Sequence, residues 1–346
     1  MTRRERVMEA LRHRETDVIP YHIDLTHQEY VRVAEYLQDP DFFGKIGNHL
    51  EGAYYDGDPA EEADSPGYFR DDFGVRWNRN GADKDIGVID GYVIGEPDRG
   101  AYTLPAVKEE DLRRRYAGLI AKDSDVFKFG MIGFSMFERA WTLRGMENFL
   151  MDMLVEPTFA EGLLDDICDY NLAVVDLALG YGLDGFYFGD DWGQQKGLIM
   201  GPNLWRKLIK PRMAKMYARV KAKGKFVIQH SCGDIEEIFP DLIEIGLDLY
   251  QTFQPEIYDI KKVKREYGMD LSFWGGISTQ RLLPFATPGE LKVKAMEIMR
   301  IMGPNGGYIA APTHAVPGDV PPENIAALIR SSRINRVAVG QILETV

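Results

Sequence analysis

The segment KFVIQHSCGDIEEIFPDLIEIG, residues 225–246, decides the fold class of this chain. Its first residues, 225–229, form a short run rich in β-branched and aromatic side chains, which predicts a buried strand. Gly233 follows at a turn, Asp234 and Glu237 are typical of a helix start, and Gly246 is typical of its end. A buried strand that leads directly into a helix is the repeating unit of parallel α/β proteins.

The same order of strand and helix recurs from about residue 128 onward. Each strand-like run is short and nearly continuously apolar, as expected where both faces of a parallel sheet are buried. An earlier run at residues 18–24 is predicted as the first strand, and Thr287, Pro288 and Glu290 mark the start of a later helix. The number of units fits a closed (β/α)8 TIM barrel better than a doubly wound sheet. The other predicted strands lie at residues 129–134, 185–189, 226–230, 247–251, 271–275 and 307–310.

Residues 25–121 depart from this order. The patterns there predict helices at residues 27–37 and 42–49, followed by an acidic, glycine-rich region at residues 51–72. Residues 87–95 predict a hairpin whose turn is Asp90-Gly91. We interpret residues 25–121 as an N-terminal helical and hairpin elaboration on the barrel, so residues 1–346 are expected to form a single domain.

Charge and composition exclude several classes of function. The formal net charge of -13 argues against nucleic acid as a partner, because phosphate binding needs a basic face. A hydrophobic fraction of 45% is ordinary for a soluble protein, and no run approaches the ~20 apolar residues of a membrane span. The two cysteines, Cys168 and Cys232, are too few for a disulfide framework. With a charged N-terminal helix and no apolar signal core, we expect a cytoplasmic protein with no membrane partner.

Polar residues gather after the predicted strands, where barrel enzymes build their active sites. His230 and Cys232 are two residues apart at a strand end, so their side chains share a face. An imidazole and a thiolate suit zinc, and His314, after the last strand, is the third candidate ligand. The alternative is that the histidine and cysteine only pack in the core, since a buried cysteine often behaves as a small hydrophobic residue.

Further candidates follow the neighbouring strands. We interpret Asp190 or Asp191 as a catalytic general acid, or as a partner that orients a metal ligand; the alternative is that both are loop or capping residues. The remaining strand ends supply residues that we expect to line a substrate pocket, namely His22, Asp24, Gln251, Gln254 and Trp274.

Six segments resemble the uroporphyrinogen decarboxylase superfamily, and the resemblance covers nearly the full length. It implies the (β/α)8 barrel and a choice between two chemistries. One is the metal-free decarboxylase of haem synthesis, whose family motif Arg-Gln-Ala-Gly-Arg follows the first strand. Residues 23–30 here read IDLTHQEY, and an acidic mouth without those arginines would repel a polycarboxylate. The six segments are residues 4–11, 228–233, 238–246, 273–277, 303–309 and 320–325.

The other chemistry is that of methyltransferases that work with corrinoid proteins. Their zinc ligands include a His-x-Cys pair, which His230 and Cys232 match, and usually a second cysteine near the position of His314. One thiolate in place of two leaves a zinc site with net positive charge, which makes the ion a stronger Lewis acid. The resemblance therefore implies Zn2+ as cofactor and methyl transfer from a small, methoxylated donor to a corrinoid protein. Activation of a thiol acceptor such as coenzyme M is less favoured.

The expected partners are the small-molecule methyl donor and a corrinoid protein, and a homodimer is compatible with the sequence. Cobalamin is expected only on the partner protein, because the chain lacks the Asp-x-His-x-x-Gly motif that binds it. Two alternatives stay open. One is a metal-free decarboxylase with another substrate, and the other is a barrel that binds a small molecule or a corrinoid protein without turnover.

Overall fold

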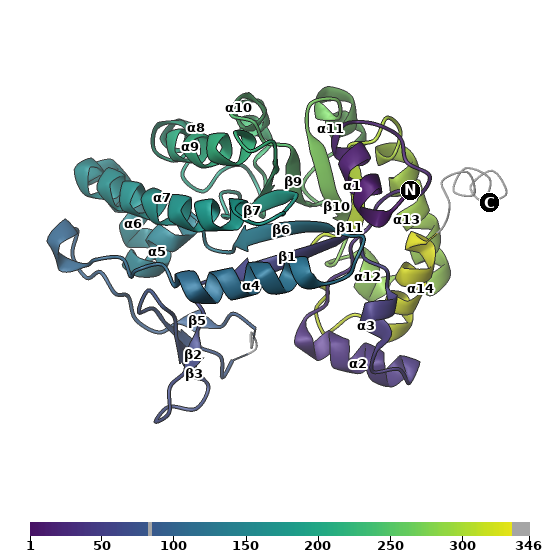
Figure 1. The fold of residues 1–346 in the computed structure, drawn as a ribbon, viewed down its shortest axis with the longest axis horizontal. Coiled ribbons are helices and arrows are strands. Elements are labelled where there is room, and N and C mark those ends of the chain that lie inside the picture. The colour runs from purple at the N-terminus through teal and green to yellow at the C-terminus, as the bar shows by residue number, and fades with distance from the viewer. Residues whose placement is uncertain (82–84, 334–346) are drawn as a thin grey trace.

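The computed structural model, which describes residues 1–81 and 85–333, is built around one curved parallel sheet (Figure 1). Its seven strands are ordered β1-β6-β7-β8-β9-β10-β11, so each new β/α unit after β6 adds its strand beside the previous one. The strands are β1 (Leu50–Tyr55), β6 (Phe127–Ile132), β7 (Gly185–Gly189), β8 (Phe226–His230), β9 (Leu249–Phe253), β10 (Ser272–Ile277) and β11 (Tyr308–Pro312).

The irregular segment around Tyr21 lies between β11 and β1 and completes the barrel-like arrangement. Tyr21 makes an isolated parallel bridge to Ala310, and its carbonyl accepts the N–H of His49 at 3.0 Å, just before β1. Pro20 has no N–H to donate, so a continuous ladder cannot form here. The predicted parallel α/β class with a barrel-like sheet is confirmed, but the predicted strand at residues 18–24 is reduced to the single bridge of Tyr21.

The predicted strands agree well with the structure after residue 128. The runs at residues 185–189 and 226–230 match β7 and β8 at both ends. The other four overlap β6, β9, β10 and β11 with shifted ends. Strand ends are set by hydrogen bonds to neighbouring strands, which an apolar run does not reveal.

The acidic, glycine-rich region at residues 51–72 does not stand apart from the barrel at its start, because β1 covers its first residues. The predicted helix at residues 42–49 is also shorter, since α3 covers only Phe42–Lys45. β1 alternates buried and accessible residues, and Glu51 and Gly52 interrupt its apolar pattern. Gly52 is needed for packing, because a Cβ there would lie 2.6 Å from the ring of Phe129. Part of the predicted elaboration therefore belongs to the barrel itself.

A small antiparallel sheet, ordered β2-β3-β4-β5, extends from the barrel (Figure 1). The predicted hairpin at residues 87–95 is wrong, because β5 pairs with β4, where Ile89 lies opposite Trp77. The N–H groups of Val93 and Ile94 instead donate to the carbonyl of Leu143, at 3.0 and 2.9 Å. The strands are β2 (Ala60–Glu61), β3 (Tyr68–Arg70), β4 (Arg76–Asn78) and β5 (Val88–Ile89).

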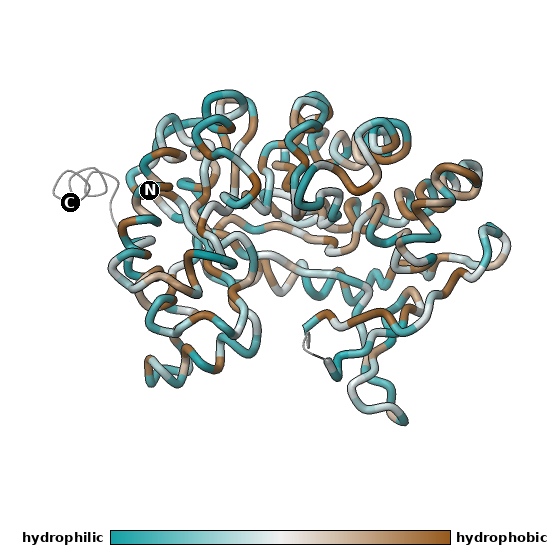
Figure 2. The backbone as a smooth tube through the Cα atoms, turned by 180° about the vertical axis from the view of Figure 1, so that it is seen from behind, coloured by the Kyte–Doolittle hydropathy of each residue, from teal (hydrophilic) through white to brown (hydrophobic). Residues whose placement is uncertain are grey.

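Helices cover the outside of the main sheet, and the hydropathy pattern follows this layering, with hydrophilic outer segments around a more apolar centre (Figure 2). The predicted cap at Thr287 is confirmed as a capping box with Glu290. None of the described helices combines the length and apolarity needed to span a membrane. The longer helices are α1 (Arg3–Leu11), α2 (His27–Leu37), α4 (Glu109–Ala121), α5 (Phe137–Arg144), α6 (Met146–Val155), α7 (Pro157–Leu179), α9 (Lys210–Lys221), α11 (Ile260–Tyr267), α13 (Pro288–Met302) and α14 (Pro322–Ser332).

The barrel interior is filled by its own cluster of side chains. Val7 and Leu11 of α1 pack into this cluster beside strand residues such as Phe129, Tyr187 and Trp274. α1 therefore plugs the interior, and a site for a small molecule is left at the other end, where the strands finish. A second, larger core lies between the sheet and the surrounding helices.

Candidate metal and substrate site

Two adjoining chambers lie at the carboxyl ends of the strands. The outer chamber has a volume of about 260 Å³ and the inner chamber about 120 Å³. The inner chamber reaches Phe129 and Trp274 of the interior cluster. A larger cavity of about 430 Å³ lies beside α7, but its lining contains no histidine or cysteine. The residues common to both chambers are Asp24, Met131, Tyr187, Gln251, His314 and Ala315.

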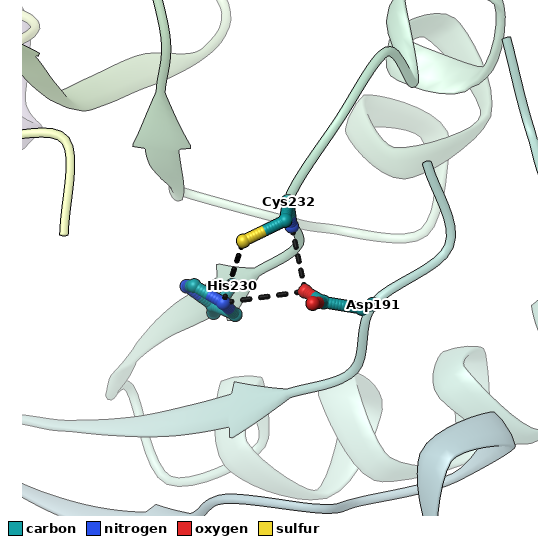
Figure 3. Close-up of side chains that lie close together, drawn as sticks. All are labelled: Asp191, His230 and Cys232. Atoms are coloured by element: carbon teal, nitrogen blue, oxygen red, sulfur yellow. Dashed lines mark hydrogen bonds and ion pairs between the residues drawn. The ribbon is translucent and has the colours of Figure 1, made fainter. Parts of the chain in front are cut away.

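Three potential metal ligands converge beside the outer chamber. Their ligand atoms, from Asp191, His230 and Cys232, all lie within 4.8 Å of one another, as in no other group of the described residues (Figure 3). Sγ of Cys232 lies 3.6 Å from Nε2 of His230, and Oδ1 of Asp191 lies 3.3 Å from the same nitrogen. The backbone N–H of Cys232 donates to Oδ1 of Asp191 at 2.6 Å. The predicted convergence of His230 and Cys232 from one strand end is therefore seen in the structure.

The residues around the pair hold the backbone in place. Ser231 is buried, and its hydroxyl accepts the N–H of Trp192 at 2.9 Å. Gly233 has φ +77, and a Cβ there would lie 2.3 Å from the carbonyl carbon of Gly193. The N–H of Gly233 donates to Oε1 of Gln254 at 2.9 Å. Only glycine fits this turn, which directs Cys232 back toward His230.

Gln251 sets the orientation of the His230 ring. Its Oε1 accepts a hydrogen bond from the hydroxyl of Tyr187 at 2.9 Å and is in close contact with Nδ1 of His230. Because an amide oxygen only accepts, Nδ1 carries a proton, and Nε2 faces Asp191 and Cys232. Metal-binding histidines are typically held in this way by a hydrogen bond at the other nitrogen. Gln251, predicted as pocket lining, thus also positions a candidate ligand.

The three groups are electrostatically matched. Burial acts to lower the pKa of His230, but Tyr187, Cys232 and Asp191 together raise it well above its usual value. Burial acts to raise the pKa of Asp191, but the contact with His230 and the N–H of Cys232 leave it lowered. The raised pKa of His230 and the lowered pKa of Asp191 are those of an ion pair, in which the imidazole holds the proton and the carboxylate is ionised. A metal cation binds such a group by replacing the proton.

His314 does not join the compact group. Its ring centre lies 6.0 Å from that of His230, and it lines both chambers from the loop after β11. Burial and the nearby His230 lower the pKa of His314. Asp191, and not the predicted His314, joins His230 and Cys232 in the group of ligand atoms within 4.8 Å of one another. His314 lines the same outer chamber, and its role as a zinc ligand stays a prediction.

Asp190 stabilises the start of α5 and does not face the cavity. It is buried, and its carboxylate accepts the N–H groups of Met136, Phe137 and Glu138 at 3.2, 3.0 and 2.7 Å. It also accepts the indole N–H of Trp192. Burial raises the pKa of Asp190 to about 6. Asp190 thus anchors the N-terminus of α5 and lines neither chamber, which favours the capping alternative for this residue.

Some of the other predicted pocket residues line the chambers, and one supports a turn beside them. Asp24 lines both chambers, while His22 and Trp274 line the inner one, their ring centres 5.3 Å apart. Gln254 lines neither chamber and supports the turn at Gly233.

Several residues of the outer chamber were not predicted. Asp56 follows β1, so recognition of that strand would have revealed it. Burial raises the pKa of Asp56 to about 7 although Arg139 opposes the shift. Glu138 lies in the first turn of α5, and its pKa is raised well above the usual value, by burial first and then by Asp191 and Asp190. Tyr187 lies within the apolar run of β7, and nothing in the sequence distinguishes it from the neighbouring core residues.

The chain belongs to the uroporphyrinogen decarboxylase family, because the model of that family matches residues 129–333. The solved structure of a methyltransferase from Methanosarcina mazei covers 96% of this chain and 98% of its own, with a TM-score of 0.72. The sequence identity is 17%, so the likeness shows a shared fold.

A D-psicose 3-epimerase solved in the presence of D-fructose is less similar, with a TM-score of 0.37 and 12% identity over 65% of this chain and 81% of that one. No curated protein matches the sequence.

Proposed function

We propose that this protein is a zinc-dependent methyltransferase that moves a methyl group from a small, methoxylated donor to the corrinoid of a separate protein. The observation that carries the proposal is the convergence of Asp191, His230 and Cys232 beside a cavity of small-molecule size. The Methanosarcina methyltransferase supports it through the shared fold.

The donor set fits zinc. One imidazole nitrogen, one thiolate and one carboxylate oxygen are all common zinc ligands, and three protein ligands leave a position open, as catalytic zinc requires. The hydrogen bond from Nδ1 to Gln251 leaves Nε2 of His230 available as the ligand atom. A bound zinc ion would supply Lewis-acid polarisation of the atom that carries the methyl group.

The chain's own residues would position the donor. The two chambers accept its organic part between aromatic side chains, with Tyr187 forming a wall common to both. In the reaction the methyl carbon leaves its oxygen and bonds to cobalt(I), which becomes cobalt(III). The oxygen keeps the bonding electron pair and takes a proton. That proton can come from solvent, which reaches the outer chamber beside Asp191.

Elemental analysis and a methyl-transfer assay test the proposal together. Protein purified without added metal is expected to hold about one zinc ion per chain. With a methoxylated compound and a cobalt(I) corrinoid, it should form methylcobalt(III), followed by its absorbance. Cys232→Ala should abolish zinc binding and methyl transfer, whereas Cys168→Ala, which changes the buried cysteine of α7, should retain both.

A second pair of variants identifies the third ligand. Asp191→Asn should reduce zinc content if Asp191 is the third ligand, and His314→Asn should reduce it if His314 is, so the variant that loses zinc names the ligand. Full activity and full zinc content in Cys232→Ala would refute the metal assignment. Active protein without metal would favour a decarboxylase-like reaction, and ligand binding without product would favour a non-catalytic barrel.

A further inference from the structure

We propose that the methyl donor carries a cationic nitrogen, as an alkylammonium or quaternary ammonium group, which Asp24, Glu138 and the aromatic walls of the outer chamber bind. This inference rests on the proposed function, because it names the chemical class of the donor.

Carboxylates dominate the charge of the outer chamber. Asp24, Asp56, Glu138 and Asp191 all line it, and they come from successive segments around the barrel. Among residues 1–81 and 85–333, no lysine or arginine lines either chamber. An anionic donor would therefore meet only repulsion from these side chains, whereas a cation would be attracted.

Two of the four carboxylates already have partners. Asp56 forms an ion pair with Arg139 at 3.3 Å, and Asp191 belongs to the metal-ligand group with His230. Asp24 and Glu138 form no ion pair with any lysine or arginine in the part of the chain that the structure describes. The histidines of the chamber do not replace such a cation, because His230 is neutral when it binds metal and burial lowers the pKa of His314.

Glu138 is the buried carboxyl of the outer chamber that most favours a cationic ligand. Its side chain is only 8% exposed, and the contact to its carboxyl is the backbone N–H of Asp191. It lies outside the group whose ligand atoms are within 4.8 Å of one another, so the metal does not account for it. Glu138 is thus a buried carboxyl on the chamber wall with no cationic side chain beside it, and a ligand cation in the chamber would favour its ionised form.

Aromatic side chains supply the second half of an ammonium site. Tyr54, Phe134 and Tyr187 line the outer chamber with the carboxylates, and Phe129 and Trp274 line the inner one. An ammonium group is attracted to the faces of such rings as well as to carboxylates. The volume of about 260 Å³ suits a small organic cation.

Calorimetric titration with matched probes tests the proposal. The probes are choline, its uncharged analogue with carbon in place of nitrogen, and the carboxylate of the same carbon skeleton. Choline should bind at least about tenfold more tightly than the uncharged analogue, and the carboxylate should not bind measurably. Choline binding should also weaken as salt concentration rises.

Charge-removing variants assign the effect to the chamber. Asp24→Asn and Glu138→Gln should each weaken choline binding by roughly three- to tenfold and leave binding of the uncharged analogue unchanged. Glu110→Gln, on the exposed face of α4, removes the same charge and should change neither. Because Asp24 is an exposed loop residue, its variant is expected to fold even where Glu138→Gln does not.

Equal binding of choline and the uncharged analogue would overturn the proposal, as would unchanged choline binding in Asp24→Asn. These titrations require neither metal nor corrinoid. A chain that binds zinc and transfers methyl groups but does not distinguish choline from its analogue would refute this inference alone.

Discussion

His230 and its neighbours show how single contacts select the chemistry of a side chain. The contact with Gln251 places the proton on Nδ1, and the same amide oxygen is held by Tyr187. Nε2 then faces the sulfur of Cys232 and the carboxylate of Asp191. Without Gln251 the ring could rotate or change tautomer, and the three ligand atoms would no longer converge.

Two adjacent carboxylates have different roles because they lie in different environments. Asp190 accepts three backbone N–H groups at the start of α5, whereas Asp191 contacts His230 and Cys232. Sequence alone offers no way to separate these neighbours, since both follow β7 directly. The separation comes from the position of α5 against the strand end.

Asp190→Asn is expected to destabilise the protein without removing a metal ligand. The amide keeps one acceptor oxygen but presents an NH2 group to N–H donors, so we expect a loss of about 1–3 kcal/mol of unfolding free energy. Urea unfolding measures the loss, and zinc content per folded chain should stay near the wild-type level. Unchanged stability, or zinc loss as complete as in Asp191→Asn, would contradict the capping role.

At the scale of elements, α2 contains a carboxyl whose ionisation is linked to stability. Glu29 is buried, and burial raises its pKa to about 7, although Arg32 lies 2.8 Å away and opposes the shift. Its Oε1 has no hydrogen-bond partner among the described residues, which suits a neutral acid. α2 therefore packs best when Glu29 carries a proton.

The sign of the pH dependence follows from the raised pKa. Between the ordinary value of 4.5 and about 7, the folded chain holds the Glu29 proton more often than the unfolded chain does. The contribution of Glu29 is thus most favourable at low pH and falls as pH rises through this range, by about 3 kcal/mol in total. Glu29→Gln should flatten the stability profile between about pH 5 and 7.

Unfolding free energies measured across this pH range check the prediction. Glu35→Gln, an exposed carboxyl on the same helix, is the matched control and should leave the profile unchanged. Parallel profiles for the wild type and Glu29→Gln would show that Glu29 is not the linked group.

At the scale of the whole molecule, Arg139 connects the small sheet to the barrel. It lies on α5 and is only 2% exposed, with ion pairs to Asp71 at 3.1 Å and Asp56 at 3.3 Å. Its guanidinium also lies 3.8 Å from the ring centre of Phe73. Asp71 and Phe73 lie between β3 and β4, whereas Asp56 follows β1. One buried cation therefore joins the two sheets beside the outer chamber.

Arg139→Met should weaken this connection strongly. It leaves two carboxylates near each other in a buried region, and loss of one partner of a buried ion pair typically costs about 3–5 kcal/mol. Limited proteolysis should then cut preferentially in and beside the small sheet, at residues 57–81 and 85–94. Arg113→Met breaks an exposed pair on α4 and should change stability by less than about 1 kcal/mol. Equal effects of the two variants would refute the connecting role.

The strands that the sequence predicts correctly are those with a regular pattern of apolar residues. Strands buried on both faces, such as β7 and β8, carry continuous apolar runs and were found at both ends. β1 was missed because Glu51 and Gly52 interrupt its pattern, and Asp56 was missed with it. The hairpin at Asp90-Gly91 was wrong because Arg76 and Leu143, distant in sequence, provide stronger partners than the local turn.

Sequence by itself determined the order of strands and helices after residue 128 and the pairing of His230 with Cys232, because both depend on local periodicity. A two-residue spacing at a strand end places two side chains on one face whatever surrounds the strand. Only the tertiary structure shows that Asp191 lies within the compact group of His230 and Cys232 and that His314 lies outside it. Both follow strand ends, and their distances to the sulfur depend on the paths of separate loops around the barrel, which no local pattern encodes.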